Sequence, residues 1–343
     1  MTADEGLFQI DQAGMDMTNK GAREEILRLF RQREEEFVSG EELSQSLGVS
    51  RTAVWKQIKL LRDLGYVIEA VPSRGYRLAT APDTLIPAEI QSGLGTRLIG
   101  REVVYFEETD STNVRAHELG ESAAPDGTVV IAEHQVAGKG RRGRQWVSPP
   151  GVNLYTSVLL RPDIFPRFAT QLTFVSAVAV ARAIEDVTDL KPRVKWPNDI
   201  LIGGKKTAGL LNEMSAETES INYVILGIGV NLNMSSGQFP SDLRYPATSV
   251  ALEQGAPVSR LDFARALFRR LDHYYLLFLE QGFSPVISDW ENLCDLMGMT
   301  VEVDCQDRII RGRAVGIDED GALLLRLPDG MRERVLAGDV RPV

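Results

Sequence analysis

A glycine-rich and arginine-rich segment near the middle of the chain limits the possible folds more than any other feature. Residues 138–146 read GKGRRGRQW, which contains the GxGxxG spacing of dinucleotide-binding folds. In those folds a helix begins at the glycines, because its N-terminus holds the pyrophosphate. Here VSPPG follows at 147–151, and no helix begins in such a segment. We therefore exclude a dinucleotide fold, and GGKKT at 203–207 lacks the GxxxxGKS/T spacing of a P-loop.

The same loop is unusually cationic. Four cations occur within six residues and no acidic residue lies among them: Lys139, Arg141, Arg142 and Arg144. Like charges this close repel one another until an anion cancels the repulsion. The composition predicts a mobile loop that becomes ordered around a polyphosphate, or around a species that carries both carboxylate and phosphate. A loop that contacts nucleic acid is the alternative that the local composition leaves open.

Composition excludes several classes of protein. With 343 residues the chain is long enough for two or three domains, and 43% hydrophobic and 25% charged residues are ordinary for a globular protein. The net charge of −10 argues against a chain that coats nucleic acid along its whole surface. The cysteines and histidines are few and scattered: Cys294, Cys305, His117, His134 and His273. We therefore expect no CxxC or HExxH metal site and no structural disulfide.

The chain begins MTADEGLFQIDQ, without the basic and apolar regions of a signal peptide. No stretch approaches 18 uninterrupted apolar residues, so no membrane partner is expected. We expect a cytoplasmic protein in which residues 1–21 form a flexible N-terminal extension.

Residues 22–79 have the pattern of a winged helix-turn-helix. An apolar helical face comes first, and Ser39, with a glutamate three residues later, is a capping-box start for a second helix. Ser50 is the expected N-cap of a third helix. Two short strands, at 66–71 and 76–78, then flank a tight turn.

Positive charge is concentrated in this domain. Between Arg51 and Arg77 six basic residues occur with two acidic ones, although the whole chain carries −10. The second helix of such a motif lies in the major groove while basic groups contact phosphates, so we expect DNA contacts from Arg51, Thr52, Lys56 and Arg74. Trp55 would lie either buried under the recognition helix or against the DNA backbone. A winged helix that binds protein, or a solvated charged face, is the alternative.

A linker at 80–84 precedes a change of pattern. Between 84 and 293 β-rich runs alternate with long helical patterns, which predicts an α+β or α/β domain. One helix is expected at 168–186, and another after Ser259, where aromatic and aliphatic residues recur every four positions and indicate core packing. From 294 to 343 short β-runs separated by Asp-Gly turns predict a small barrel.

Five motifs occur in series along the central region: DSTN at 110–113, the cationic loop at 138–144, KWPND at 195–199, GKKTAG at 204–209 and GIGVN at 227–231. In this order they resemble the bifunctional biotin–protein ligases that also repress the biotin operon. The resemblance implies an α+β multidomain fold with an N-terminal winged helix-turn-helix, a central α/β ligase domain of the biotin/lipoate ligase type and a C-terminal SH3-like β-barrel.

That family joins biotin to ATP, which gives biotinyl-5′-adenylate and pyrophosphate, and then passes biotin to a lysine of a carrier domain. Charge repulsion opposes attack of a carboxylate on a polyanion, and cations lower that barrier; the catalytic candidates are Arg141 and Lys206. The resemblance places biotin against Ser111, Thr112, Asn113, Gln135, Lys139, Gly140, Arg141 and Lys206. It places ATP or the adenylate against Arg142, Arg144, Trp196, Asn198, Asp199 and Asn231. Mg²⁺ would arrive with ATP and lie near Asp199, and no metal is expected on the protein alone.

The resemblance also implies partners. These are the biotin carboxyl carrier protein of a biotin-dependent carboxylase such as acetyl-CoA carboxylase, an operator DNA with an inverted repeat, and a second copy of the chain when the adenylate is bound. A ligase without DNA binding, a non-enzymatic biotin-sensing transcription factor and a lipoate ligase are the alternatives.

Plainer interpretations of single residues also stay open. Lys206 could be a surface lysine, Trp196 could simply lie in an extended turn before its proline, and glycines 227 and 229 could only permit close packing. Two positions depart from the family pattern. Lys139 stands where an arginine is commoner, and Asn212 stands where an aliphatic residue is usual.

Overall fold

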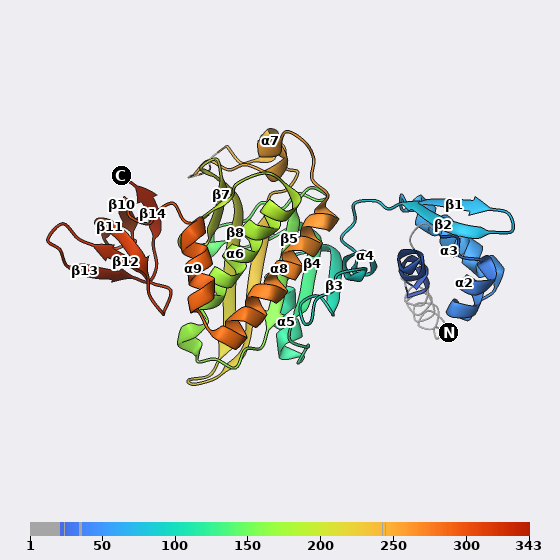
Figure 1. Ribbon diagram of the computed structural model, residues 1–343, viewed down its shortest axis with the longest axis horizontal. Helices are drawn as coiled ribbons and strands as arrows, with labels where there is room; N and C mark the ends of the chain where they lie inside the picture. The colour runs from blue at the N-terminus through green and yellow to red at the C-terminus, as the bar shows by residue number, and fades with distance from the viewer. Residues whose placement is uncertain (1–20, 24, 34–35, 242, 244) are drawn as a thin grey trace, which may run out of the picture. The chain divides into compact units, whose positions relative to one another are not determined.

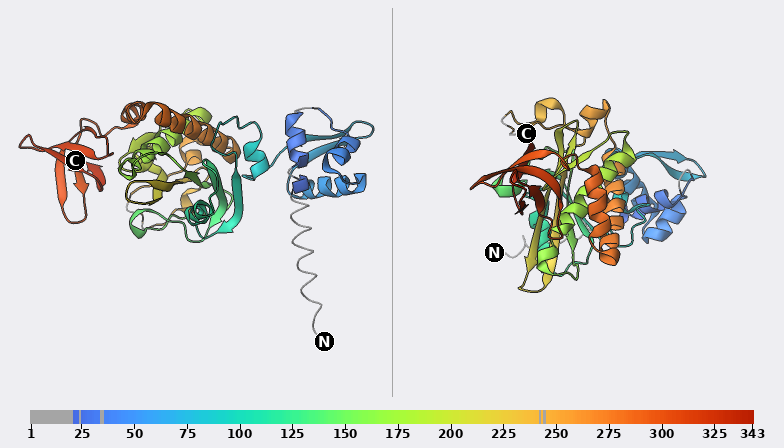
Figure 2. Two further views of the ribbon diagram at one scale, coloured as in Figure 1. Left: turned by 90° about the horizontal axis from the view of Figure 1, so that it is seen from below. Right: turned by 60° about the vertical axis from the view of Figure 1, so that its left-hand side comes forward.

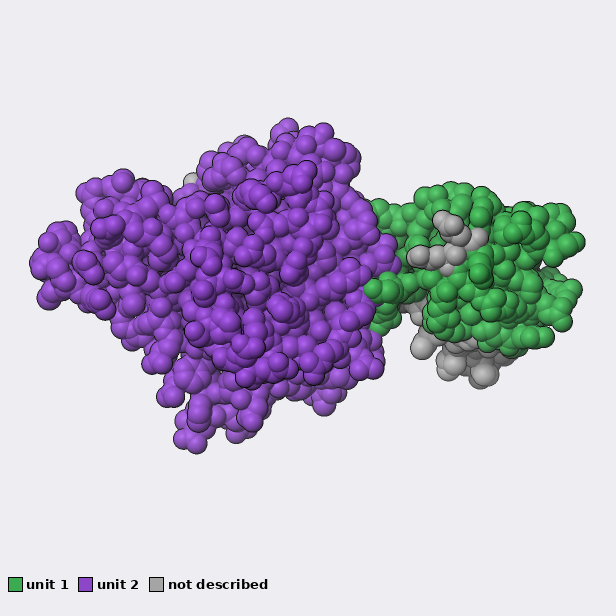
Figure 3. Space-filling view, viewed as in Figure 1, with its two compact units in different colours: residues 1–93 green, residues 94–343 purple. Residues whose placement is uncertain are grey.

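The computed structural model describes residues 21–23, 25–33, 36–241, 243 and 245–343. The extension expected at 1–21 therefore lies outside the described residues, except for Gly21. The chain divides into two compact units, Met1–Gly93 and Leu94–Val343 (Figure 3).

The first unit is the expected winged helix-turn-helix. Residues 25–32 are helical and are followed by α2 (Gly40–Leu47) and α3 (Arg51–Asp63). The caps are as predicted, because the Ser39 and Ser50 side chains accept hydrogen bonds from the Glu42 and Ala53 N–H groups. The wing is an antiparallel hairpin of β1 (Val67–Val71) and β2 (Gly75–Thr80). The core that joins these elements includes Ile26, Phe30, Leu43, Val54, Ile58, Leu61 and Tyr66.

The boundary after the winged helix differs from the predicted start of the next domain at 84. Helix α4 (Pro87–Gln91) belongs to the first unit, where Ile86 and Ala88 pack against its core. Glu89 is completely buried and lies 2.7 Å from the Arg31 guanidinium. The sequence shows a loop-like linker, but the buried ion pair that holds this segment joins residues far apart in the chain.

The second unit is built on a seven-stranded sheet in the order β3-β4-β5-β9-β8-β7-β6 (Figure 1). Only its β3–β4 pair is parallel, so no dinucleotide-binding topology forms, and the exclusion made from the glycine loop holds. The strands are β3 (Val103–Thr109), β4 (Thr128–Gln135), β5 (Leu154–Leu160), β6 (Arg193–Lys195), β7 (Asp199–Ile202), β8 (Lys205–Ala216) and β9 (Ile221–Val230).

Helices cover both faces of this sheet. Figure 2 shows α5 (Thr112–Glu121) on the face opposite α6 (Gln171–Val187) and α8 (Arg260–Gln281). Helix α9 (Ser284–Leu293) packs beside α6 and α8, and the short α7 (Val250–Gln254) follows β9. In α8 the repeated apolar residues are all buried, as core packing predicts: Phe263, Leu267, Leu271, Tyr275 and Phe278.

Helix α6 begins later than the predicted 168, because Pro166–Phe168 forms a separate 3₁₀ turn. Within the described residues, the segment Pro166–Val187 is long and apolar enough to cross a membrane. However, 72% of its most apolar stretch is buried inside the unit, which is the burial of a core helix.

The predicted small β-domain is present at the C-terminus. It is a five-stranded antiparallel sheet in the order β13-β12-β11-β10-β14. Alternate residues such as Val301, Val303 and Ala314 are buried, whereas their neighbours face outward. The strands are β10 (Thr300–Asp304), β11 (Ile309–Ile317), β12 (Leu323–Arg326), β13 (Arg332–Val335) and β14 (Asp339–Pro342).

Candidate active site

A cavity of about 240 Å³ opens in the second unit where the five sequence motifs converge. Its wall includes the cationic loop, the N-terminus of α5, the segment between β6 and β7, and parts of β8 and β9. Every residue that the sequence analysis assigned to biotin, ATP or the adenylate lines this one cavity: Ser111, Thr112, Asn113, Gln135, Lys139, Gly140, Arg141, Arg142, Arg144, Trp196, Asn198, Asp199, Lys206 and Asn231.

One side of the cavity is a buried polar network at the start of α5. The Thr112 N–H donates to Gln135 Oε1 over 2.9 Å, and Gln135 Nε2 donates to the Ser148 hydroxyl over 2.9 Å. The Ser157 hydroxyl donates to Asn113 Oδ1 over 2.6 Å. Because these buried groups are mutually paired, their positions are fixed independently of a ligand.

Asn113 is held from two further directions. Its Nδ2 donates to the Leu211 carbonyl over 3.1 Å and to Glu213 Oε2 over 2.6 Å. A Cβ atom at Gly227 would lie 2.3 Å from Asn113 Oδ1, so this strand position requires glycine. The glycine of the GIGVN motif therefore does permit close packing, and what packs there is a polar residue of the cavity wall.

The cationic loop is held by groups from distant parts of the chain. Arg141 donates to Asn198 Oδ1 over 3.1 Å, and burial, together with the neighbouring Arg142, lowers the pKa of its guanidinium. The Arg142 and Arg144 guanidinium groups lie 3.5 and 2.9 Å from Asp339 Oδ2 in β14. The loop itself contains no acidic residue, and Asp339 of the C-terminal domain supplies one.

Lys206 also lines the cavity. Its Nζ is 2.6 Å from Asp199 Oδ1 and 5.5 Å from the centre of the Trp146 ring. Among the described residues no group of three His, Cys, Asp or Glu side chains could hold a metal ion. Asp199 is the carboxylate nearest to Lys206, and it is already in an ion pair, so a divalent cation here would depend on ligands that a nucleotide brings.

Two of the predicted residues face the cavity with their polar groups committed elsewhere. Trp196 is 1% exposed, and its Nε1 donates to the Gly321 carbonyl over 3.1 Å. Asn231 Nδ2 donates to the Thr248 carbonyl over 3.1 Å. These side chains therefore shape the wall and hold neighbouring segments in place.

Sequence reasoning missed Trp146 and Asp339 as parts of the wall. A Cβ atom at Gly209 or Gly229 would lie 2.9 or 2.6 Å from the Trp146 ring, so both glycines make room for the indole. Glycines on the two paired strands β8 and β9 were a usable signal for a large side chain lying across them. Asp339 had no comparable signal, because its arginine partners lie almost 200 residues away.

The first unit presents the predicted DNA-facing residues at its surface. Arg51, Thr52, Lys56 and Arg74 are exposed, and Trp55 is 52% exposed, which excludes its burial under the recognition helix. Arg51 lies 2.8 Å from Glu41, and the Arg74 guanidinium lies 4.3 Å from the centre of the Phe37 ring. The recognition helix thus exposes cationic and aromatic side chains together.

Comparison with known proteins identifies the family. The chain is 40% identical over 318 residues to the bifunctional ligase/repressor BirA of Bacillus subtilis, which covers 93% of this chain and 98% of the relative. The chain belongs to the biotin protein ligase family. It is also 35% identical to the bifunctional ligase/repressor BirA of Escherichia coli, over 89% of this chain and 92% of the relative.

Family sequence models and a solved structure agree. The models described as HTH domain, Biotin/lipoate A/B protein ligase family and Biotin protein ligase C terminal domain match residues 22–77, 105–231 and 298–341. The biotin protein ligase from Aquifex aeolicus, solved in complex with biotin and ATP, is 29% identical and superimposes with a TM-score of 0.61. That comparison covers 71% of this chain and 100% of the other.

Proposed function

We propose that this protein is an ATP-dependent, AMP-forming biotin–protein ligase that is also a DNA-binding repressor of biotin synthesis genes. The observation that carries the enzymatic part is that a buried polar wall and a cluster of cations line the same cavity. The exposed cationic recognition helix and the relatedness to bifunctional ligase/repressors support the DNA-binding part.

In the first step a carboxylate oxygen of biotin attacks the α-phosphorus of ATP, and pyrophosphate leaves with the bonding electrons. Both reactants are anions, so groups that neutralise the phosphates lower the barrier. Lys206 and Arg141 suit this role because each is held at the cavity by an acceptor, Asp199 or Asn198. Mg²⁺ would arrive on ATP, with Asp199 the nearest carboxylate, and would further neutralise the phosphates.

In the second step the neutral amine of a carrier lysine attacks the carbonyl carbon of the adenylate, an amide forms and AMP leaves. Biotin itself is bound, in this proposal, by the polar wall of Ser111, Thr112, Asn113 and Gln135, with Lys139, Gly140 and Arg141 from the loop and with Lys206. A few fixed polar groups in a pocket orient a small ligand well. The nucleotide lies against Arg142, Arg144, Trp196, Asn198, Asp199 and Asn231.

The partners follow from this activity. The protein substrate is the biotin carboxyl carrier domain of a biotin-dependent carboxylase, and the reaction takes place in the cytoplasm. As a repressor the protein binds operator DNA with an inverted repeat, and two copies associate when the adenylate orders the cationic loop. We assign the DNA contacts to Arg51, Thr52, Trp55, Lys56 and Arg74, and the exposure of all five on the recognition helix or wing supports this assignment.

The test is exchange of labelled pyrophosphate into ATP by the purified chain with Mg²⁺, with biotin and lipoate as parallel substrates. We expect exchange with biotin and none with lipoate. Exchange with lipoate alone would change the substrate assignment. A folded protein that exchanges with neither acid would contradict the enzymatic proposal and favour a non-enzymatic biotin sensor.

A further inference from the structure

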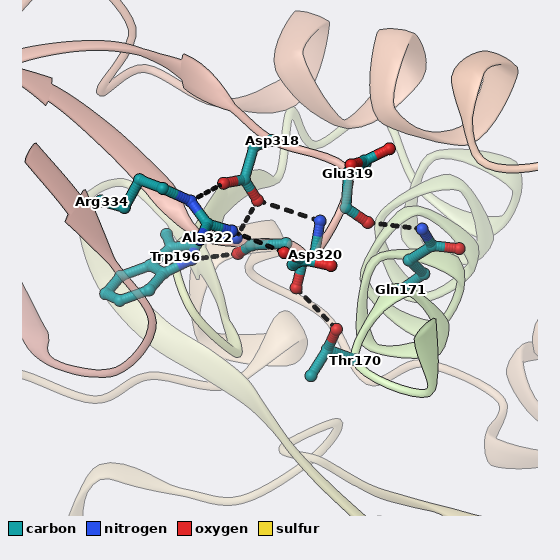
Figure 4. Close-up of polar contacts among 9 residues, drawn as sticks. Thr170, Gln171, Trp196, Asp318, Glu319, Asp320, Ala322 and Arg334 are labelled. Carbon is teal, nitrogen blue, oxygen red and sulfur yellow. Dashed lines mark hydrogen bonds and ion pairs between the residues drawn. The ribbon is translucent and has the colours of Figure 1, made fainter. Parts of the chain in front are cut away.

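A turn in the C-terminal domain contacts the ligase domain through three successive backbone carbonyls (Figure 4). The Glu319 carbonyl accepts from Gln171 Nε2 over 2.5 Å, and the Asp320 carbonyl accepts from the Thr170 hydroxyl over 2.7 Å. The Gly321 carbonyl accepts from Trp196 Nε1 over 3.1 Å. We call this segment the 318–322 turn. Because the ligase domain contacts its backbone carbonyls, these contacts depend on the conformation of the turn.

Asp318 gives the turn that shape. Its Oδ1 accepts hydrogen bonds from the N–H groups of Asp320 and Ala322, both over 3.0 Å. Its Oδ2 accepts from Arg334 Nε over 2.5 Å, and Arg334 also binds Asp320 (Figure 4). Burial alone would raise the pKa of Asp318, but the hydrogen bonds from Arg334 and from the two N–H groups hold it below its ordinary value.

Gly321 lets the turn approach the ligase domain closely. Its φ of +78° is a conformation that side chains rarely adopt, and a Cβ atom there would lie 2.8 Å from the Phe174 ring. Phe174 is a buried residue of α6, so its ring has little room to move away. A side chain at 321 would therefore displace the carbonyl that binds Trp196.

Trp196 connects this contact to the candidate catalytic residues. It is almost completely buried and stands directly before the segment that carries Asn198 and Asp199. Asn198 holds Arg141 and Asp199 holds Lys206, over 3.1 and 2.6 Å. The 318–322 turn thus anchors the segment whose side chains orient both cations.

We infer that Asp318 and Gly321 are positioning residues for the nucleotide half of the active site. They touch no substrate. They hold Trp196 in place, and through it the acceptors of Arg141 and Lys206. The buried polar wall assigned to biotin is paired within the ligase domain itself, so its geometry does not depend on this turn. The inference rests on the proposed ligase function.

The experiment compares Gly321→Ala with Gly330→Ala in the full chain. Gly330 lies in another turn of the same domain with φ of +86°, and a Cβ atom there would meet nothing within 4 Å. Both variants carry the same kind of backbone strain, but only Gly321→Ala moves the turn away from Phe174. We expect Gly321→Ala to raise the KM for ATP in pyrophosphate exchange about tenfold, which is the effect of losing one or two hydrogen bonds. Biotin affinity, measured by calorimetry, should change less than the KM for ATP, because the buried polar wall stays paired. In Gly330→Ala both quantities should stay within about twofold of wild type.

A second pair of variants covers the case in which Gly321→Ala does not fold. Asp318→Asn removes the negative charge that binds Arg334. The control is Glu333→Gln, which lies next to Arg334 on β13 and removes an ion pair of 2.7 Å with Arg308. Asp318→Asn should raise the KM for ATP selectively, whereas Glu333→Gln should not.

Unchanged ATP kinetics in the folded 321 or 318 variants, or a parallel loss of ATP and biotin affinity, would overturn the inference while leaving an active ligase. Wild-type protein without any exchange would instead contradict the proposed function itself and remove the basis of the inference.

Discussion

Single residues around the cavity show how cations can be placed before a ligand arrives. Lys206, Arg141 and Arg144 each contact an acceptor: Asp199 on the adjacent strand for Lys206, and the distant Asn198 and Asp339 for the two arginines. These acceptors reduce the repulsion between the cations and orient their side chains at the cavity wall. Charges fixed in advance stabilise a developing negative charge more effectively than charges that must first reorganise.

Lys206→Ala tests this placement most directly. Removing a cation that stabilises charge in the transition state should slow single-turnover adenylation by about 10²- to 10³-fold. Biotin affinity should change much less, since the buried polar wall stays paired. Rapid-quench measurement of adenylate formation separates the two effects.

Lys205→Ala is the matched control. Its Nζ pairs with Glu253 over 2.5 Å, and it does not line the cavity, so adenylation should proceed at the wild-type rate. Equal rates for Lys206→Ala and wild type would mean that Lys206 is merely a surface lysine.

Structural features that depend on neighbouring residues could be predicted from the sequence, whereas features that depend on distant segments could not. The caps at Ser39, Ser50 and Ser259 and the buried stripe of α8 follow from residues close together in sequence, and all were predicted. The position of α4 in the first unit and the pairing of Asp339 with the cationic loop were not. Those features depend on contacts between distant segments, which local patterns do not encode.

Strand β9 illustrates a mixed case, because its glycines were recognised but their neighbours were not. A Cβ atom at Gly227 would lie 2.3 Å from Asn113 Oδ1 and 2.6 Å from the Leu211 carbonyl. Overpacking of this kind costs about 1–3 kcal/mol. If the strain is relieved by displacing Asn113, Gly227→Ala should weaken biotin binding by up to the same amount, about 5- to 150-fold. Calorimetric titration with biotin measures this.

Gly237→Ala controls for the loss of a glycine in the same unit, because a Cβ atom there meets nothing within 4 Å. Its biotin affinity should equal that of wild type. Wild-type affinity in the Gly227→Ala variant would contradict the role assigned to Asn113 in the biotin site.

Across the whole molecule the two proposed activities lie in different compact units. The residues predicted to contact DNA all belong to the first unit, and those that line the cavity all belong to the second. The sequence already indicated this division, since a locally basic segment occurs within a chain of net charge −10. The order of the motifs predicted which residues line the cavity. The hydrogen bonds that hold these residues could not be predicted, because they join segments that only the fold brings together.

The division into units predicts that a surface charge can alter DNA binding without altering catalysis. Lys56→Glu places a negative charge on the exposed face of α3. Binding to a nonspecific DNA duplex, measured by fluorescence anisotropy at several salt concentrations, should weaken, and its slope against the logarithm of salt concentration should fall by about 1. Pyrophosphate exchange should be unchanged.

Lys191→Glu makes the same change in net charge in the second unit, where the side chain is 77% exposed, and should leave the slope as in wild type. Equal affinity and slope for Lys56→Glu and wild type would show that this face of the recognition helix does not contact DNA.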